Sequence, residues 1–488
     1  MTFVLGNGTE LTADFAAALP AFVRASWGEE QPDPRLVLFN RPLAVRLGLD
    51  PEWLASPEGI AFLCGRGNPA DQPPQAMAYA GFQFGQFNPY MGDGRALLLG
   101  EVRDAHGVLR DLHVKGSGRT PFSRPGADGR ATLPAMLREY VFSEALHAMG
   151  IPTTRCLAVI STGRPVARER ALPGGISVRV AASHLRVGTF HYAQLRGPEA
   201  TRSLADYAIR RHYPALADTA EPYRDFFRAV MEAQIATVVR WQEAGFIHGV
   251  MNTDNTTISG ESIDFGPCAF GERFDPHAVF SSIDRFGRYA FGHQPNILGW
   301  NLTRLAESLL PILSDDPSSA TEVAQQEVDS FGERFGNYAT DYTRRETLGL
   351  SDDAPDALVR RWRELLAESQ PDLTTCHRDL AAAAGGDAEA TWRLADTLGE
   401  KEWVNEWLAA GPDATRLDRH HPRFIPRPRA VENALDAAAD GDFAPTERLV
   451  TALTDKDADV DALPDDEREL FTHPDPGGLE NYLTYCGT

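Results

Sequence analysis

Residues 248–255 read His-Gly-Val-Met-Asn-Thr-Asp-Asn, and residues 263–266 read Ile-Asp-Phe-Gly. Asn255 offers an amide oxygen and Asp264 a carboxylate, and such hard ligands suit magnesium held together with phosphate groups. An Asn-Thr-Asp-Asn run can equally form an ordinary turn. The flanking His-Gly and Asp-Phe-Gly favour a metal site instead, and Asp254 could then activate a hydroxyl or tune that site.

The spacing of the two segments is similar to that in the active site of kinase-like phosphotransferases. There, His-Gly-Asp-x-x-x-x-Asn supplies a base and a metal ligand, and a later Asp-Phe-Gly supplies a second ligand. In this chain Val250 stands at the position of the base, and a valine cannot accept a proton. Either the chain has lost catalysis, or Asp254 serves a different reaction.

The composition excludes several classes of protein. A chain of 488 residues is long enough for two or three domains with their own cores. No run of about 18 apolar residues suggests a membrane span, and the first residues lack the basic segment of a signal peptide. The formal net charge of −22 argues against non-specific binding to nucleic acid or to an anionic membrane. We therefore expect no nucleic-acid partner and no membrane partner.

The cysteines are scattered along the chain, without a Cys-x-x-Cys pair or a nearby histidine cluster. They are Cys64, Cys156, Cys268, Cys376 and Cys486. This pattern excludes a zinc site and a disulfide framework. Free thiols fit a reducing compartment, so we expect a cytoplasmic protein. We also expect the protein to be a monomer.

The remaining sequence predicts an α+β protein with strands first and helices later. Residues 1–78 mix a short helix with turns and are expected to form an N-terminal extension. Residues 79–190 combine glycine-rich loops, a helix over 132–149 capped by Thr132, and strands. The predicted strands cover 96–102, 110–115, 157–161 and 176–182.

Residues 191–350 are mostly helical, with a long amphipathic helix over 222–244 leading into His248 and another helix over 301–313. Residues 351–488 are expected to form a helical C-terminal extension. Strands and one helix, followed by a helical region with the metal motif, are the order of a kinase-like bilobal fold.

Three groups of residues upstream are candidates for binding phosphate. Gly92 and Gly94 would let backbone N–H groups approach an oxyanion, and Arg95 adds a bidentate donor. A glycine-rich hairpin with an arginine is equally a plain turn. Asp128 and Gly129 form a second tight polar turn that could reach a nucleotide.

Lys115 ends a predicted strand, where a lysine can bind nucleotide phosphates. Glu139 of the following helix is its natural partner. Arg179 and Arg186 could clamp a polyphosphate more specifically than lysines would. The alternatives are a solvated lysine and surface salt bridges.

Together these residues resemble the selenoprotein O (SelO/YdiU) family of protein adenylyltransferases, which have a kinase-like fold. The resemblance covers about residues 36–313 and the terminal cysteine. The motifs that carry it are Leu38-Phe39-Asn40, Leu47-Gly48-Leu49-Asp50, Gln83-Phe84-Gly85, Met91 to Arg95, Lys115 to Arg124, Arg138-Glu139-Tyr140, Arg179 with Arg186, His248 to Asn255, Ile263 to Pro267 and Trp300-Asn301-Leu302.

The resemblance implies that ATP binds reversed relative to ordinary kinases, so that AMP is transferred to Ser, Thr or Tyr hydroxyls of protein substrates. It implies that Glu139 holds Lys115, that Asn255 and Asp264 bind Mg²⁺ or Mn²⁺, and that Asp254 is the catalytic base. The implied ATP contacts are Gly92, Gly94, Arg95, Lys115, Asp128, Gly129, Arg179, Arg186 and, through the metal, Asp264.

The chain departs from the family pattern at three places. Phe82 stands where members often have histidine, and the loop around Asp128 is one residue longer. Cys486 matches the family's C-terminal selenocysteine or cysteine, but residues 280–282 lack the cysteine that some bacterial members use for a regulatory disulfide. Cys268 is the candidate replacement.

Two other functions stay open at this stage. One is an ordinary kinase that transfers the γ-phosphate with Asp254 as base. The other is an inactive ATP-binding scaffold, although such a scaffold would be free to lose Lys115, Glu139, Asn255 and Asp264.

Overall fold

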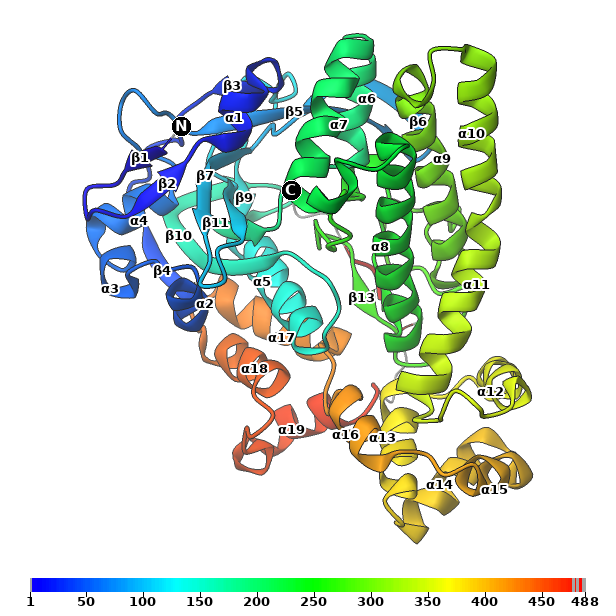
Figure 1. The fold of residues 1–488 in the computed structure, drawn as a ribbon. Helices are drawn as coiled ribbons and strands as arrows, with labels where there is room; N and C mark the ends of the chain where they lie inside the picture. The colour runs from blue at the N-terminus through cyan, green and yellow to red at the C-terminus, as the bar shows by residue number, and fades with distance from the viewer. Residues whose placement is uncertain (1, 476–478, 480–481, 485–488) are drawn as a thin grey trace.

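The computed structural model describes residues 2–475, 479 and 482–484, and it is a mixed α+β structure. Strands dominate the first part of the chain and helices the rest (Figure 1). Within the described residues one sheet has eleven strands, with the order β1-β2-β7-β8-β11-β10-β4 and with β3, β5, β6 and β9 joined off this path. The strands are β1 (Thr2–Val4), β2 (Glu10–Thr12), β3 (Val23–Ala25), β4 (Arg35–Phe39), β5 (Gln75–Gln83), β6 (Gln86–Gly92), β7 (Ala96–Arg103), β8 (Leu109–Lys115), β9 (Ala131–Thr132), β10 (Arg155–Ala167) and β11 (Ala171–Ala181).

The predicted strands are confirmed, but the N-terminal region holds more strand than its sequence indicates. Residues 2–39 contribute β1 to β4 to the same sheet as β7 and β8. These strands have three to five residues, too few for apolar alternation to stand out against a turn.

The sheet is buried on both faces. Leu98 of β7 packs in the same apolar cluster as Leu137, whereas Leu99 and Val114 lie in a second cluster with Phe62. Neighbouring residues of a strand point to opposite faces, so β7 reads as a continuous run of buried leucines. The first cluster includes residues of the helices α1 (Asp14–Ala18) and α5 (Leu133–Ala148). The second includes residues of α2 (Arg41–Arg46), α3 (Pro51–Leu54) and α4 (Pro57–Leu63).

Helix α5 begins after Thr132 at the N-cap, with Pro134 in its first turn, as predicted. It is buried around most of its circumference, including Arg138, Glu139 and Glu144. The reason is that it lies between the sheet and the late helices α17 (Pro428–Ala439) and α18 (Ala444–Thr454) (Figure 1).

The helical part is built around α8 (Pro222–Ala244), which matches the predicted helix and ends at Gly245 in the left-handed conformation, with φ 74°. The short strands β12 (Phe246–Ile247) and β13 (Ala269–Phe270) pair and bracket the two motifs. Helix α9 (Gln294–Leu313) begins earlier than predicted. The side chain of Gln294 accepts from His248 N at 3.0 Å and donates to Phe246 O at 2.9 Å, which ties the start of α9 to the first motif.

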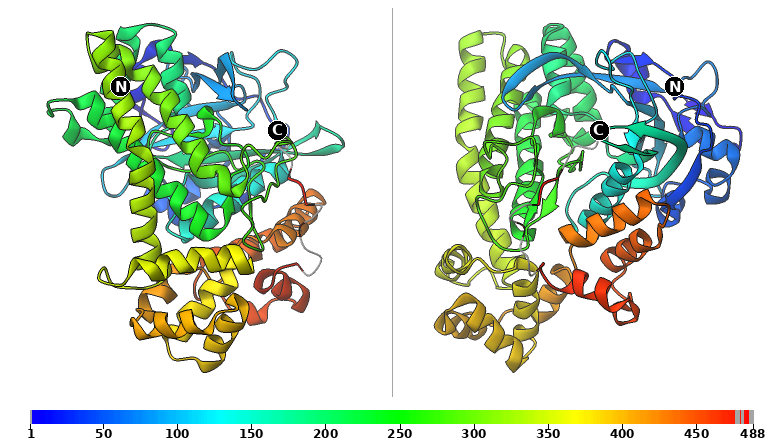
Figure 2. Two further views of the ribbon diagram at one scale, coloured as in Figure 1. Left: turned by 90° about the vertical axis from the view of Figure 1, so that its right-hand side faces the viewer. Right: turned by 180° about the vertical axis from the view of Figure 1, so that it is seen from behind.

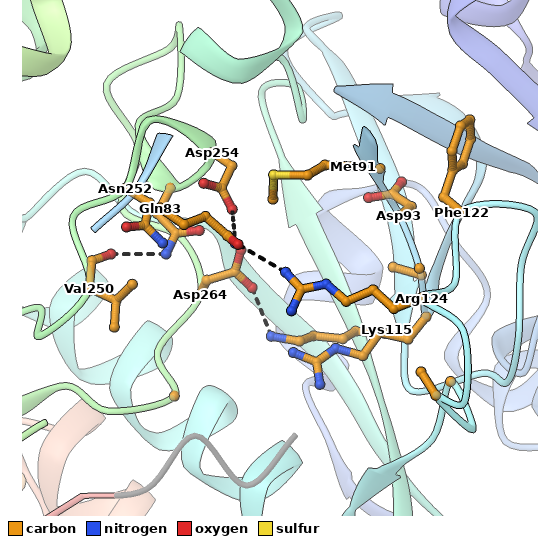
Figure 3. A pocket seen from close by; sticks show the side chains of 18 of the residues that line it. Gln83, Met91, Asp93, Lys115, Phe122, Arg124, Val250, Asn252, Asp254 and Asp264 are labelled. Atoms are coloured by element: carbon orange, nitrogen blue, oxygen red, sulfur yellow. Dashed lines mark hydrogen bonds and ion pairs between the residues drawn. The ribbon is translucent and has the colours of Figure 1, made fainter. Parts of the chain in front are cut away.

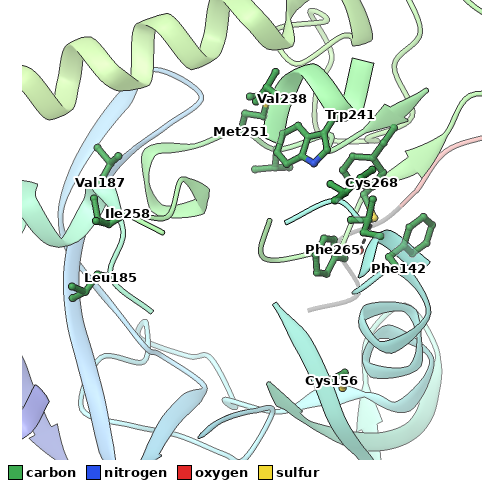
Figure 4. Close-up of a cluster of buried hydrophobic side chains, with 14 of the residues drawn as sticks. Phe142, Cys156, Leu185, Val187, Val238, Trp241, Met251, Ile258, Phe265 and Cys268 are labelled. Atoms are coloured by element: carbon green, nitrogen blue, oxygen red, sulfur yellow. Dashed lines mark hydrogen bonds between the residues drawn. The ribbon is translucent and has the colours of Figure 1, made fainter. Parts of the chain in front are cut away.

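The core is continuous between the two parts of the chain. Phe142 of α5, Trp241 of α8 and Phe265 belong to one apolar cluster, which Figure 4 shows around the second motif. The other helices here are α6 (Val187–Gln194), α7 (Pro198–His212), α10 (Pro317–Asp329) and α11 (Phe331–Tyr342).

The last third of the chain is helical, as expected. A separate apolar cluster with Trp362, Trp403 and Trp407 holds its first helices together, and Figure 2 shows them below the main body. These helices are α12 (Asp356–Ser369), α13 (Leu373–Ala384), α14 (Ala388–Leu398), α15 (Lys401–Ala409) and α16 (Ala414–His420), and α19 (Asp465–Thr472) follows α18. No helix in the described part of the chain is long and apolar enough to cross a membrane.

Candidate functional site

A cavity of about 810 Å³ gathers most of the predicted site residues (Figure 3). Its lining includes Gly92, Gly94, Arg95, Lys115, Asp128, Gly129, Arg179, Arg186, Asp254, Asn255 and Asp264. Glu139 does not line the cavity but contacts two of the residues that do. The sheet contributes one wall and the two motifs the other, so residues far apart in sequence share one site.

A network of buried charges lies at the wall of this cavity. Lys115 Nζ pairs with a Glu139 oxygen and, at 2.7 Å, with Asp264 Oδ1. Arg179 joins the same two carboxylates, with Nη2 2.6 Å from Glu139 Oε2. Arg186 Nη1 donates to Asp264 Oδ2 at 2.9 Å. Three cations thus face two carboxylates, and the net positive charge favours an anion in the cavity.

Asp264 is held ionised and in an unusual backbone conformation. Its burial opposes ionisation, but the charges of Arg179, Lys115 and Arg186 outweigh that cost and hold its pKa well below the usual range. Its φ is +66°, in the left-handed region that is uncommon for residues other than glycine. The left-handed conformation of Asp264 costs on the order of 1 kcal/mol, and the ion pairs with the three cations offset this cost.

Asp254 lies in the opposite situation, as a buried carboxylate that lacks a neutralising partner. Burial raises its pKa to about 6, although the charge of Arg186 opposes the rise. Its Oδ1 has no hydrogen-bond partner among the described residues. Gly81 and Gly188 allow this close packing, because a Cβ on Gly81 would lie 3.1 Å from Asp254 Oδ1 and one on Gly188 would lie 2.4 Å from Ala80 O. A buried carboxylate with a free oxygen can accept a proton.

Asn255 presents its amide oxygen to the cavity. Its Nδ2 donates to Val250 O at 2.9 Å, and its Oδ1 has no partner within the described residues. The described part of the chain has no group of three His, Cys, Asp or Glu side chains that could hold a metal. A metal here would therefore rely on Asn255, Asp264 and oxygens of a bound phosphate.

The two polar turns frame the other end of the cavity. Gly92 has φ 154°, and a Cβ there would lie 2.5 Å from the ring of Phe122. Gly129 has φ 70°, and a Cβ would lie 2.3 Å from Gly118 C, so both positions require glycine. Asp128 pairs with Arg168 at 2.9 Å. The guanidinium of Arg95 makes no hydrogen bond or ion pair with any residue that the structure describes, which leaves it free for a ligand.

Several residues that line the cavity were not predicted from the sequence. Asp93 accepts from Met77 N at 3.0 Å and pairs with the buried His113 at 2.9 Å, which fixes the turn between Gly92 and Gly94. Gln83, Asn252 and Arg124 also line it. All four residues lie in motifs that carry the family resemblance, but their types and spacing alone predict no role, because their place in the cavity depends on tertiary contacts.

The C-terminal part of the chain supports the second motif from behind. Arg138, next to Glu139, donates to Gly266 O at 2.9 Å and to Cys268 O, and it pairs with Glu432 at 2.9 Å. Thr484 Oγ1 donates to Pro267 O at 2.7 Å. Cys268 is buried, which raises its pKa far above the usual range. Cys486 lies outside the described residues, so a regulatory disulfide between Cys486 and Cys268 stays an open question.

Comparisons with known proteins agree on one family. The family model described as protein adenylyltransferase SelO matches residues 9–454. A protein of Corynebacterium efficiens named protein nucleotidyltransferase YdiU is 48% identical over 489 residues, which cover 98% of this chain and 96% of the relative. Proteins of the same name from Mycobacterium sp. strain KMS and Pseudarthrobacter chlorophenolicus are 48% and 47% identical and are matched over their full lengths, with 98% and 100% of this chain covered.

Proposed function

Because the chain belongs to the protein adenylyltransferase SelO family and is a nucleotidyltransferase, we propose that it transfers AMP from ATP to Ser, Thr or Tyr hydroxyls of other proteins. Pyrophosphate is the second product. The observation that carries this assignment is the buried set of three cations, Lys115, Arg179 and Arg186, in one wall of the cavity.

The charge distribution supports transfer of AMP rather than of phosphate. Two arginines and a lysine can neutralise the two phosphates that depart together as pyrophosphate. Val250 replaces the base of a kinase, so the chain keeps no carboxylate where γ-phosphoryl transfer requires one. In this sense the chain is a pseudokinase with a different reaction.

We also propose that the sheet-rich and helical parts are the two lobes of a kinase-like fold, with the lobes at 79–190 and 191–350 and extensions at 1–78 and 351–488. The cavity between sheet and motifs supports this division. The described cysteines are free and buried, which supports a cytoplasmic location.

The residues present fit a divalent metal. Asn255 and Asp264 supply an uncharged and a charged oxygen, the ligand types that Mg²⁺ and Mn²⁺ accept together with phosphate oxygens. When bound, the metal would offset negative charge on the reacting phosphate. In this structure Lys115, Arg179 and Arg186 all contact Asp264. Binding of a triphosphate would draw these cations to its oxygens and reduce their hold on the Asp264 carboxylate.

Asp254 is the proposed base. With its pKa raised to about 6 by burial, it is mostly ionised at neutral pH and still basic enough to take a proton in the transition state. Arg186 Nη1 donates to the backbone oxygen of Asp254 at 2.6 Å as well as to Asp264. In this structure the same guanidinium therefore links the backbone of the proposed base to the proposed metal ligand.

Labelled ATP separates the three possible functions. The protein is incubated with ATP labelled at the α- or the γ-phosphate, with Mg²⁺ or Mn²⁺ and a protein acceptor, and protein-bound label is measured. Label from the α-position alone is expected. Label from the γ-position alone would indicate a kinase, and no label from either position would indicate a scaffold. The D264A variant is the negative control.

A further inference from the structure

The turn between β5 and β6 lies directly on the first motif. Phe84 and Gly85 form this two-residue turn with φ 49° and 81°, the combination that a type I′ hairpin requires. Three consecutive residues of the hairpin bond to three consecutive residues of the motif. Phe82 N donates to Thr253 Oγ1 at 2.8 Å, Gln83 Nε2 to Asp254 Oδ2 at 3.4 Å, and Phe84 N to Asn252 Oδ1 at 3.0 Å.

The hairpin is fixed in this place by aromatic contacts as well. The hydroxyl of Tyr289 donates to Asn252 Oδ1 at 2.6 Å, and its ring lies 5.0 Å from that of Phe84. Phe82 packs edge-on against Trp300 at 5.3 Å. A phenylalanine at positive φ costs on the order of 1 kcal/mol. These contacts offset that cost, so the backbone of Gln83 has little freedom to move.

The amide of Gln83 can take only one orientation here. Arg124 Nη2 donates to Gln83 Oε1 at 2.9 Å, and an arginine can only donate. The Oε1 atom must therefore face Arg124, which turns Nε2 toward Asp254 Oδ2 (Figure 3). The other oxygen of Asp254, Oδ1, is buried and has no partner among the described residues.

We propose that Gln83 is a positioning residue that holds Oδ2 of Asp254 and so fixes the orientation of the carboxylate that takes the proton of the acceptor hydroxyl. This rests on the proposed function. In the step, the acceptor O–H bond breaks and its proton goes to the Asp254 carboxylate, the acceptor oxygen bonds to the α-phosphorus, and the bond from that phosphorus to pyrophosphate breaks with its electron pair leaving on pyrophosphate. The 3.4 Å contact is long, as contacts at such sites often are before substrate binds.

The Q83M variant tests the proposal, because methionine keeps the length of glutamine and removes its donor. The expected result is a fall of about tenfold in kcat, the effect of about 1.4 kcal/mol in the transition state, with KM and Kd for ATP unchanged. The matched control is Q86M. Gln86 is exposed and pairs with Gln83 across the same hairpin. The Q86M substitution therefore shows what a glutamine-to-methionine change does to the hairpin itself, without removing a contact to Asp254. Equal falls in both variants, or a changed Kd for ATP in Q83M alone, would overturn the proposal.

A double-mutant cycle with D254N shows whether Gln83 acts through Asp254. If it does, Q83M costs nothing further in the D254N background, whereas a tenfold loss in both backgrounds means a structural role and overturns the proposal. If D254N alone transfers AMP at the normal rate, the base of the proposed function is wrong. If D254N is slow but Q83M is normal, only the role of Gln83 is wrong. If D254N transfers no measurable AMP, the kinetics of Q83M alone decide whether the proposal stands. A fall in kcat with KM unchanged supports it, and a change in KM with kcat unchanged overturns it.

Discussion

Lys115 and Asp264 lie 149 residues apart in the chain and form a buried ion pair of 2.7 Å. Lys115 ends β8, whereas Asp264 belongs to the segment between β12 and β13. The sheet-rich and helical parts of the protein therefore meet at charged groups in the cavity. An anion that binds there competes for Lys115 and changes the environment of Asp264, so ligand binding and the contact between the two parts are coupled.

Removal of Asp264 should abolish transfer. In D264A the proposed metal loses its only carboxylate ligand and Arg186 loses its ion-pair partner. Among the described residues Lys115 and Arg179 then keep only Glu139 as an ion-pair partner. We expect a loss of at least about a hundredfold in AMP transfer, measured with α-labelled ATP. The control D33A removes an exposed partner of Arg35 and should transfer normally. Normal transfer by D264A would mean that this residue does not bind the metal.

Removal of Glu139 should act on stability first. Glu139 is buried and pairs with both Lys115 and Arg179, so E139A leaves two buried cations with Asp264 alone. Breaking a buried ion pair from one side costs about 3–5 kcal/mol of the free energy of unfolding. The measurement is denaturant unfolding, with E52A as control, because Glu52 forms an exposed pair with Arg41 and should cost less than about 1 kcal/mol. An equal loss of unfolding free energy in E139A and E52A would contradict the role of Glu139 as the buried partner of Lys115 and Arg179.

The sequence predicts the charged residues of the site better than it predicts the residues that hold them. Lys115, Glu139 and Asp264 belong to local patterns of strand, helix and triplet, so their types and spacing mark them. Gln83 and Arg138 stand in motifs that carry the family resemblance, but their residue types and spacing predict no role for them. Gln83 reaches Asp254 only because the hairpin folds over the first motif, and Arg138 contacts the carbonyls of Gly266 and Cys268 only because α5 packs beside them. Contacts of this kind depend on the folded chain.

The fold shows the same limit. The helix over 222–244 is long enough for its apolar period to fix both ends, and its bounds agree with the structure. The short strands β1 to β4 have no period of their own and form because they pair with longer neighbours or with one another. Their existence follows from the sheet, which a single sequence does not display.

The rate of transfer should fall in acid because of Asp254. Its pKa is raised to about 6 by burial, and a base acts only when it is ionised. We expect kcat/KM to fall about tenfold per pH unit below pH 6. Asp264, whose pKa is held well below the usual range, stays ionised between pH 5 and pH 7 and therefore does not contribute to the pH dependence of kcat/KM. A profile that is flat from pH 7 to pH 5 would contradict the role of Asp254.

The D254N variant should be inactive and more stable than the wild-type protein. Asp254 has an ordinary pKa of 3.8 and a folded-state pKa of about 6, so the folded protein binds more protons than the unfolded chain between these values. The free energy of unfolding therefore falls as pH rises through this window, by roughly 3 kcal/mol in total. Asparagine removes the buried charge, so D254N should recover about that amount at pH 7. At pH 3.5 the two proteins should differ little, and an equal gain at both pH values would point to a cause other than the charge.

The R138M variant tests whether the C-terminal part of the chain supports the site. Arg138 donates to two carbonyls beside Asp264 and pairs with Glu432 of α17. Methionine removes these donors and leaves the carbonyls without them, which should cost about 3 kcal/mol of the free energy of unfolding. Because Gly266 and Cys268 lie close after Asp264 in the chain, we also expect transfer to require a higher metal concentration. The control is R170M, since Arg170 forms an exposed pair with Asp436 of the same helix. If R138M loses stability but keeps its metal requirement, Arg138 holds the fold together without positioning Asp264.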